Sequence, residues 1–171
     1  MPRRPGTSSP RSQIFQFLAK FLATWFLALG AIAAIPAVDR WTVQATMASL
    51  AAVAHLLRME YVAAGSYVTL AGATLDIVSD CTPLMPTLAL WCAILAFPAR
   101  WTWKALGMSA GALLLWIYNL SRVLALALVL RHHPAWFEFV HAYLWQTATL
   151  GIVLLMFIGW VRIQMQRRVA P

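Results

Sequence analysis

The chain has 171 residues, of which 62% are hydrophobic and only 11% are charged. Charged residues make up about a quarter of a typical soluble domain, so this composition excludes an ordinary soluble protein and indicates one membrane domain. The net charge of +8 does not indicate nucleic-acid binding, because the basic residues lie in short flanks between apolar segments and form no clustered face.

The first apolar segment covers residues 14–35 and follows a polar, basic stretch at residues 1–13. We predict a disordered basic cytoplasmic tail for residues 1–13. We predict a spanning helix for residues 14–35, since about 20 apolar residues cross a bilayer. A cleavable signal peptide is the alternative, because Ala31-Ile32-Ala33 resembles a cleavage site. We favour the uncleaved helix because the later segments also need a membrane.

A turn predicted at residues 36–40 leads to a second apolar stretch at residues 41–57. This stretch is rich in alanine, is short for a span, and carries polar side chains such as Gln44 and His55. We therefore predict a helix that lies in the membrane interface. A segment that enters the bilayer and returns, giving six crossings in all, is the alternative.

The hydrophobic pattern changes to a period of two between residues 65 and 78. Apolar residues at 68, 70, 75 and 77 alternate with polar ones around Ala71-Gly72, which is typical of two short strands joined by a glycine turn. A hairpin with unpaired edges cannot lie exposed in lipid. We therefore expect a short β-hairpin on the outer face or under a protein cover.

Three further apolar segments cover residues 83–97, 107–130 and 141–163. A basic, aromatic connector at residues 98–104 joins the first two, and residues 166–171 form a basic cytoplasmic tail. The sequence therefore predicts an α-helical polytopic membrane protein whose single membrane domain covers residues 14–165. It has about four transmembrane helices plus the interfacial helix and the hairpin.

The distribution of basic residues predicts the orientation, because short loops rich in Lys and Arg stay in the cytoplasm. The N-terminal tail, the connector and the C-terminal tail are the basic clusters. We therefore expect both termini in the cytoplasm of an inner-membrane protein. Cys81, His141 and all five acidic residues then lie on the outer face.

Arg122 lies within an apolar segment, eight residues before its outer end. An arginine at such a depth costs at least about 2.5 kcal/mol, so it should face the interior of the bundle and have a partner. Asn119 shares its helix face at the i, i+3 spacing. The alternative is an arginine with a purely structural role.

Cys81 precedes a predicted helix, and His141 opens the last one with Glu138 three residues earlier. A helix N-terminus and a nearby arginine lower the pKa of a thiol in general. Glu138 is placed to orient His141. The alternative for Cys81 is a small buried hydrophobic residue, which is also our interpretation of Cys92.

A cysteine, an arginine and a histidine at one membrane face suit acyl transfer. The thiolate attacks a peptide carbonyl, the imidazole moves the proton, and the guanidinium offsets charge on the oxyanion. We expect no cofactor, because the sequence shows no metal-ligand spacing and no nucleotide or redox motif.

With these residues the chain resembles the exosortase/archaeosortase family of membrane-embedded, transpeptidase-like cysteine proteases. The resemblance covers about residues 65–151 and includes Asn119-Leu120-Ser121-Arg122. It implies that Cys81, Arg122 and His141 are catalytic. It also implies a substrate, the C-terminal sorting signal of exported proteins, with frequent ties to exopolysaccharide production.

The resemblance is incomplete beside the cysteine, where family members commonly have glycine two residues later and this chain has Pro83. Two other functions compete. One is a non-enzymatic assembly subunit for exopolysaccharide or surface-protein export, and the other is a lipid-linked glycan transferase or flippase component. Only the protease requires the Cys81 sulfur. The sequence predicts neither the oligomeric state nor the acceptor nucleophile.

Overall fold

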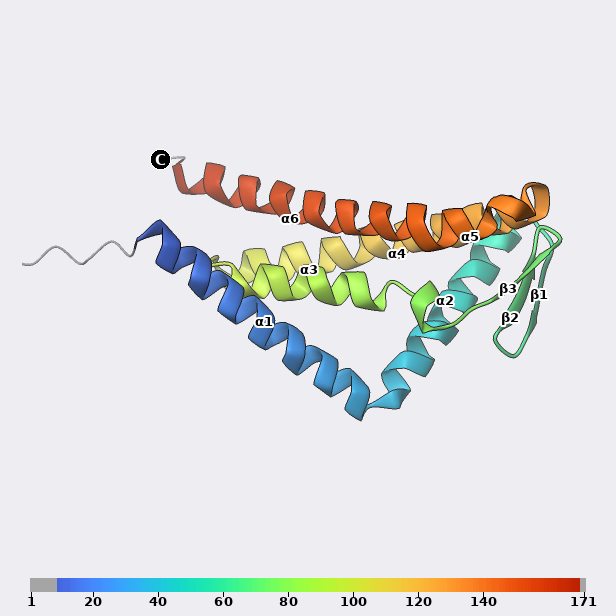
Figure 1. The fold of residues 1–171 in the computed structure, drawn as a ribbon, viewed down its shortest axis with the longest axis horizontal. Helices are drawn as coiled ribbons and strands as arrows, with labels where there is room; N and C mark the ends of the chain where they lie inside the picture. The colour runs from blue at the N-terminus through green and yellow to red at the C-terminus, as the bar shows by residue number, and fades with distance from the viewer. Residues whose placement is uncertain (1–8, 170–171) are drawn as a thin grey trace, which may run out of the picture.

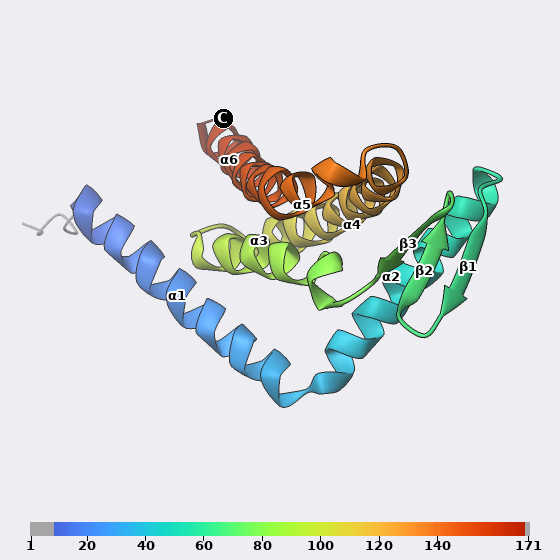
Figure 2. The same ribbon diagram turned by 45° about the vertical axis from the view of Figure 1, so that its right-hand side comes forward.

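The computed structural model describes residues 9–169, which are mainly helical. The helices, in chain order, are α1 (Pro10–Ala34), α2 (Pro36–Leu56), η1 (Ser79–Cys81), α3 (Leu84–Ala96), α4 (Trp101–His132), η2 (Pro134–Trp136), α5 (Phe137–Phe139), η3 (Val140–Leu144) and α6 (Trp145–Val169). The strands are β1 (Tyr61–Ala64), β2 (Tyr67–Leu70) and β3 (Ala73–Asp76). Figures 1 and 2 show the start of α1 and the end of α6 at one end of the molecule, with the sheet at the other.

Three helical segments are long and apolar enough to cross a membrane: Arg11–Ala34, Trp101–His132 and Pro134–Arg167. The predicted class, a helical membrane protein, is confirmed at this level. The fourth predicted span is the short apolar helix α3, which lies against α1, α4 and α6. Its 13 residues measure about 20 Å at 1.5 Å per residue, which is less than the hydrocarbon core of a bilayer.

Two predictions near the N-terminus are wrong, and a proline explains each. The helix α1 begins at Pro10, and the Ser9 hydroxyl caps it by accepting a 3.3 Å hydrogen bond from the Ser12 N–H. Residues 10–13 are therefore helical, and residues 1–8 of the predicted tail lie outside the described residues. The predicted turn at 36–40 is the first turn of α2. Proline suits the first position of a helix, where its missing N–H has no intrahelical partner.

Two later boundaries also differ from the prediction. The helix α4 already begins at Trp101, so most of the predicted connector at residues 98–104 is helical. The helix α6 continues to Val169 and takes in most of the predicted tail, while residues 170–171 lie outside the described part. Basic side chains near a helix C-terminus interact favourably with its dipole, so the charge there does not end the helix.

The sheet has three antiparallel strands in the order β1-β2-β3, one more than the predicted hairpin. The loop between β2 and β3 is Ala71-Gly72, with φ angles of 54° and 80°. Such left-handed angles match the two-residue turn that suits twisted strands. The strand β1 was missed because its residues do not alternate between apolar and polar, and three of its four side chains are exposed.

Helices cover one face of this sheet. The buried cluster draws on α2, the sheet with the residue after it, and α4: Leu50, Ala54, Val68, Leu70, Ala73, Leu75, Ile77, Val123 and Ala127. A second cluster joins α3, α4 and α6 through Leu90, Ile94 and Leu115, with Met156 and Trp160 packed against them. The first cluster fixes the sheet against α4, and so positions the residues that follow β3.

Candidate functional site

Cys81 ends a single 3-10 turn, Ser79–Cys81, between β3 and α3; we call it the Cys81 turn. The Cys81 N–H donates to the carbonyl of Val78 at 2.8 Å, and the Thr82 hydroxyl donates to the carbonyl of Ser79 at 2.7 Å. The half-buried thiol lies 3.8 Å from the carbonyl oxygen of Asp76 at the end of β3. The turn is therefore closed by local bonds and presents its sulfur on the side of the sheet.

Two buried side chains of α4 hold the Cys81 turn by its backbone. Asn119 donates from Nδ2 to the carbonyl of Cys81 at 2.8 Å, and Arg122 donates from Nη1 to the carbonyl of Asp80 at 3.4 Å. Their exposed fractions are 4% and 9%. The i, i+3 spacing on one helix face lets both reach adjacent carbonyls. Arg122 therefore has a partner, as its position requires, and this partner is a backbone oxygen.

The Nε atom of Arg122 is a buried donor without a protein partner among the described residues. Such a group is costly unless a ligand or water satisfies it. Arg122 therefore keeps one donor available close to the Cys81 turn.

A third anchor of the turn comes from α2, and sequence reasoning missed it. The Ser79 hydroxyl donates to Oδ2 of Asp39 in the first turn of α2. The two residues lie 40 positions apart, and neither belongs to a motif. No sequence signal predicts this pair, because it depends on how α2 folds back toward the start of α3.

A cavity of about 300 Å³ brings Cys81 together with His141 and Glu138. Asp76 and Thr74 of β3 are its other polar residues. The remaining lining is apolar and comes from β3 and the two residues after it, from α4 and from α5: Leu75, Ile77, Val78, Val123, Leu126, Leu130 and Phe137. We call this space the Cys81 cavity. In nucleophilic catalysis a thiol can act as the nucleophile and an imidazole as its general base, and here both groups line one small, mostly apolar cavity.

His141 lies in the π-helical turn η3, just before α6. Such turns interrupt the regular ladder of hydrogen bonds and often occur at functional sites. The half-buried ring of His141 stacks on Phe137, with ring centres 5.5 Å apart and planes inclined by 13°. Within residues 9–169, no hydrogen bond joins it to Glu138 or to the thiol of Cys81. Phe137, rather than the predicted Glu138, therefore sets the plane of the imidazole.

Arg122 and Asn119 do not line the Cys81 cavity; they contact the backbone of the turn. The predicted set therefore divides into two groups. Cys81, His141 and Glu138 meet in the cavity, while Asn119 and Arg122 fix the turn that carries the thiol.

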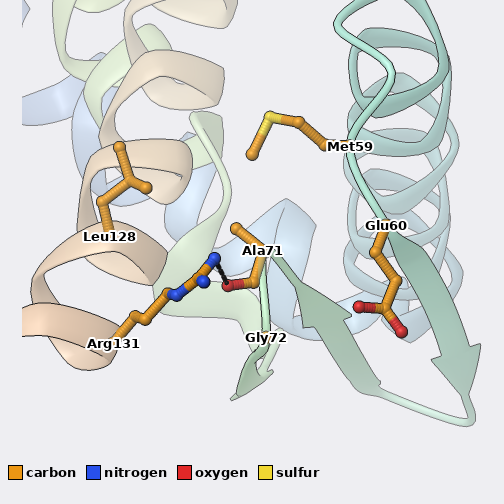
Figure 3. Close-up of a pocket in the computed structure, with 6 residues that line it drawn as sticks. All are labelled: Met59, Glu60, Ala71, Gly72, Leu128 and Arg131. Carbon is orange, nitrogen blue, oxygen red and sulfur yellow. Dashed lines mark hydrogen bonds between the residues drawn. The ribbon is translucent and has the colours of Figure 1, made fainter.

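A larger cavity of about 510 Å³ lies beside the loop between β2 and β3 (Figure 3). Arg131 donates from Nη1 to the carbonyl of Ala71 at 2.9 Å on one side of it, and Glu60 extends on the other. Met59, Gly72 and Leu128 complete the lining. This lining contains no thiol, hydroxyl or imidazole, so the smaller Cys81 cavity is the candidate active site despite its size.

Comparisons with protein-family models, with curated proteins and with solved structures return no match to this chain. The Cys81 cavity and the residues that hold its turn are therefore the features that point to a function.

Proposed function

We propose that the protein is a membrane-embedded cysteine protease or transpeptidase that cleaves a C-terminal sorting signal of exported proteins. The observation that supports this most is that Cys81 and His141 line one cavity although they lie far apart in the sequence. In addition, buried Asn119 and Arg122 hold the turn that carries the thiol. A cysteine with a purely packing role requires neither arrangement.

In the proposed reaction, His141 takes the proton of the Cys81 thiol and the sulfur attacks the peptide carbonyl carbon. The carbon–nitrogen bond of the peptide then breaks, and the imidazolium returns its proton to the leaving amine. The resulting thioester passes to water or to an amine acceptor, which releases the thiol. Hydrogen bonds between catalytic groups are often long before substrate binds, so the free enzyme need not show a thiol–imidazole bond.

The role proposed for Arg122 is electrostatic. Its guanidinium carries positive charge beside the Cys81 turn, and its unpartnered Nε is a donor in a buried setting. Donors in such settings stabilise developing negative charge more than they do in water. Pro83 has no N–H to contribute near the thiol, so this donor matters more here.

For the topology, we propose that α1, α3, α4 and α6 cross the inner membrane and that α2 lies at its outer face. Both termini are then cytoplasmic and the Cys81 cavity faces outward. Two observations support this orientation: the start of α1 and the end of α6 lie at one end of the molecule, and the sheet lies at the other (Figure 1). Arg11 at the start of α1 and Arg167 near the end of α6 place basic charge at the first end.

The deciding experiment replaces the sulfur. Cys81→Ala and Cys81→Ser strains should accumulate the full-length precursors of proteins that end in a short motif, an apolar helix and a basic cluster. Serine should fail as well, because a hydroxyl needs a stronger base than a thiol does. Cys92→Ala is the matched control, because Cys92 is buried within α3 away from the cavity, and it should process normally.

If the Cys81→Ala strain, at matched membrane abundance, trims its precursors normally, Cys81 is not the nucleophile. The interaction of Arg122 with Asp80 would then be purely structural, and the non-enzymatic assembly subunit would become the better proposal.

A further inference from the structure

Basic side chains gather at the end of the molecule opposite the sheet. They are Arg11, Lys20, Arg100, Lys104, Arg162 and Arg167, in α1, at the start of α4 and near the end of α6. All five acidic residues of the chain lie elsewhere, in α2, in and next to the sheet, in the Cys81 turn and in α5. Within residues 9–169, none of these six basic side chains forms an ion pair with an acidic one. This concentration of positive charge has no protein counterpart in the described chain.

Trp103 connects the start of α4 to the end of α6. Trp160 donates from Nε1 to the carbonyl of Trp103 at 3.2 Å, and the guanidinium of Arg167 lies 4.0 Å from the centre of the Trp103 ring. Gln164 lies on the same helix face, four residues after Trp160 and three before Arg167. Its side chain therefore faces the start of α4.

Gln164 is a buried polar residue whose amide nitrogen has no partner in the part of the chain that the structure describes. Its exposed fraction is 5%, and Nε2 has no hydrogen-bond acceptor among the described residues. A buried donor of this kind is destabilising unless something accepts from it. Arg167 and Lys104 at the start of α4 are cations, so an anionic acceptor would satisfy the amide of Gln164 and also balance their charge.

The start of α4 adds further donors. Arg100 caps the helix without a side-chain hydrogen bond. The Trp103 N–H donates to the carbonyl of Arg100 at 3.1 Å, so the N–H groups of Trp101 and Thr102 are the ones that lack intrahelical partners and carry partial positive charge. The ammonium of Lys104 donates to the carbonyl of Leu95 at 2.6 Å, which places its positive charge near the start of α4.

We propose that the start of α4, with Lys104, Gln164 and Arg167, binds the phosphate of an anionic phospholipid headgroup. Helix N-termini with nearby cations are suited to phosphate. A lipid is favoured over a free phosphate because the site lies at one end of long apolar helices, beside the 68% exposed Trp101. Exposed tryptophans typically lie at headgroup level, and anionic lipids attract basic segments there.

The test measures lipid retained by the full-length protein. Detergent-purified protein is titrated with phosphatidylglycerol, phosphatidylcholine or inorganic phosphate, and bound lipid is counted by native mass spectrometry. Arg167→Gln should bind phosphatidylglycerol about five-fold more weakly, as expected for the loss of one cation near a headgroup. Arg162→Gln is the matched control, because it removes the same charge from another side of α6 and should bind like the wild type.

Gln164→Leu keeps the charge and removes only the buried amide, so it should also weaken phosphatidylglycerol binding. If Gln164→Leu does not fold, lipid binding by the Arg167→Gln variant still tests the proposal, because the side chain of Arg167 is exposed. Equal losses in Arg162→Gln and Arg167→Gln would overturn the site in favour of diffuse electrostatics. If phosphatidylcholine binds as tightly as phosphatidylglycerol, the site does not select an anionic headgroup. If equimolar inorganic phosphate displaces the lipid, the ligand is free phosphate and not a lipid.

Discussion

Asn119 donates a 2.8 Å hydrogen bond to the carbonyl of Cys81, 38 residues earlier in the chain. Asn119→Ala leaves this carbonyl unpaired in a partly buried place, which should lower the free energy of unfolding by about 1–3 kcal/mol. It should also reduce precursor processing, because the thiol loses its fixed position. Thermal unfolding in detergent and precursor accumulation check the two effects. Ser121→Ala is the control, since the exposed Ser121 hydroxyl bonds only to the carbonyl of Tyr118; equal behaviour of both variants would contradict the role of Asn119.

Arg122→Lys keeps the positive charge but removes the planar set of five donors. We expect a folded protein with most of its processing activity lost, because an ammonium does not reproduce both the contact with the carbonyl of Asp80 and the free Nε donor. Precursor accumulation at matched membrane abundance is the measurement. Normal processing would mean that only the charge of Arg122 matters.

The two cysteines should differ in their reaction with a membrane-impermeant maleimide. Cys81 is half-buried and lines a cavity, whereas Cys92 is 3% exposed within α3. Intact cells should therefore be labelled in the Cys92→Ala variant and not in the Cys81→Ala variant. If the Cys92→Ala protein is labelled only after the cells are broken, Cys81 lies on the cytoplasmic side and the proposed orientation is wrong.

Gly107 allows α4 and α6 to approach closely. A Cβ atom at this position would overlap the ring of Trp160, which is held in place by its bond to Trp103. Gly107→Ala should therefore lower the free energy of unfolding by about 1–3 kcal/mol, as overpacking usually does. Gly151→Ala is the control, because a Cβ there meets no atom within 4 Å. Comparable melting temperatures for the two variants would show that the two helices separate at little cost.

Ionisation of the Tyr61 hydroxyl should make the folded protein less stable at alkaline pH. Its hydroxyl donates to the carbonyl of Met47 at 3.1 Å, and burial raises the pKa of Tyr61. The folded state therefore holds the proton more tightly than the unfolded state, so this stability is present below about pH 10 and is lost as the pH rises further. Tyr61→Phe should be less stable near neutral pH, yet lose less stability than the wild type as the pH rises above about 10. Melting curves over this range measure it, and parallel curves for both proteins would contradict the prediction.

The helical membrane class followed from the sequence because length and apolar composition alone decide it. The long apolar stretches around residues 14–35 and 107–130 correspond to α1 and α4. Boundaries were less predictable where proline or basic residues occur. Pro36 and Arg100 were interpreted as breaks, although both positions are compatible with a helix start.

The candidate site was predictable only in part, because some of its contacts join residues that lie far apart in the sequence. Cys81 and His141 were found because each is a reactive residue beside a predicted helix end, and they share a cavity. The bond between Asp39 and Ser79 and the stacking of Phe137 on His141 were not found. Both depend on which helix faces pack together, and common residue types carry no signal of that kind.

Under the proposed topology and function, the length of α3 determines which peptide bonds the Cys81 cavity can reach. With 13 residues this helix is roughly 10 Å shorter than the hydrocarbon core, a mismatch that a bilayer accommodates by thinning locally. If α3 crosses the membrane as proposed, thinning there would lower the cavity toward the bilayer centre, because the Cys81 turn lies just before α3. Under the proposed function, a bond is then cut only if it descends to that depth. A soluble domain stays above it, whereas the first residues of a membrane anchor are within reach, so depth itself selects the substrate.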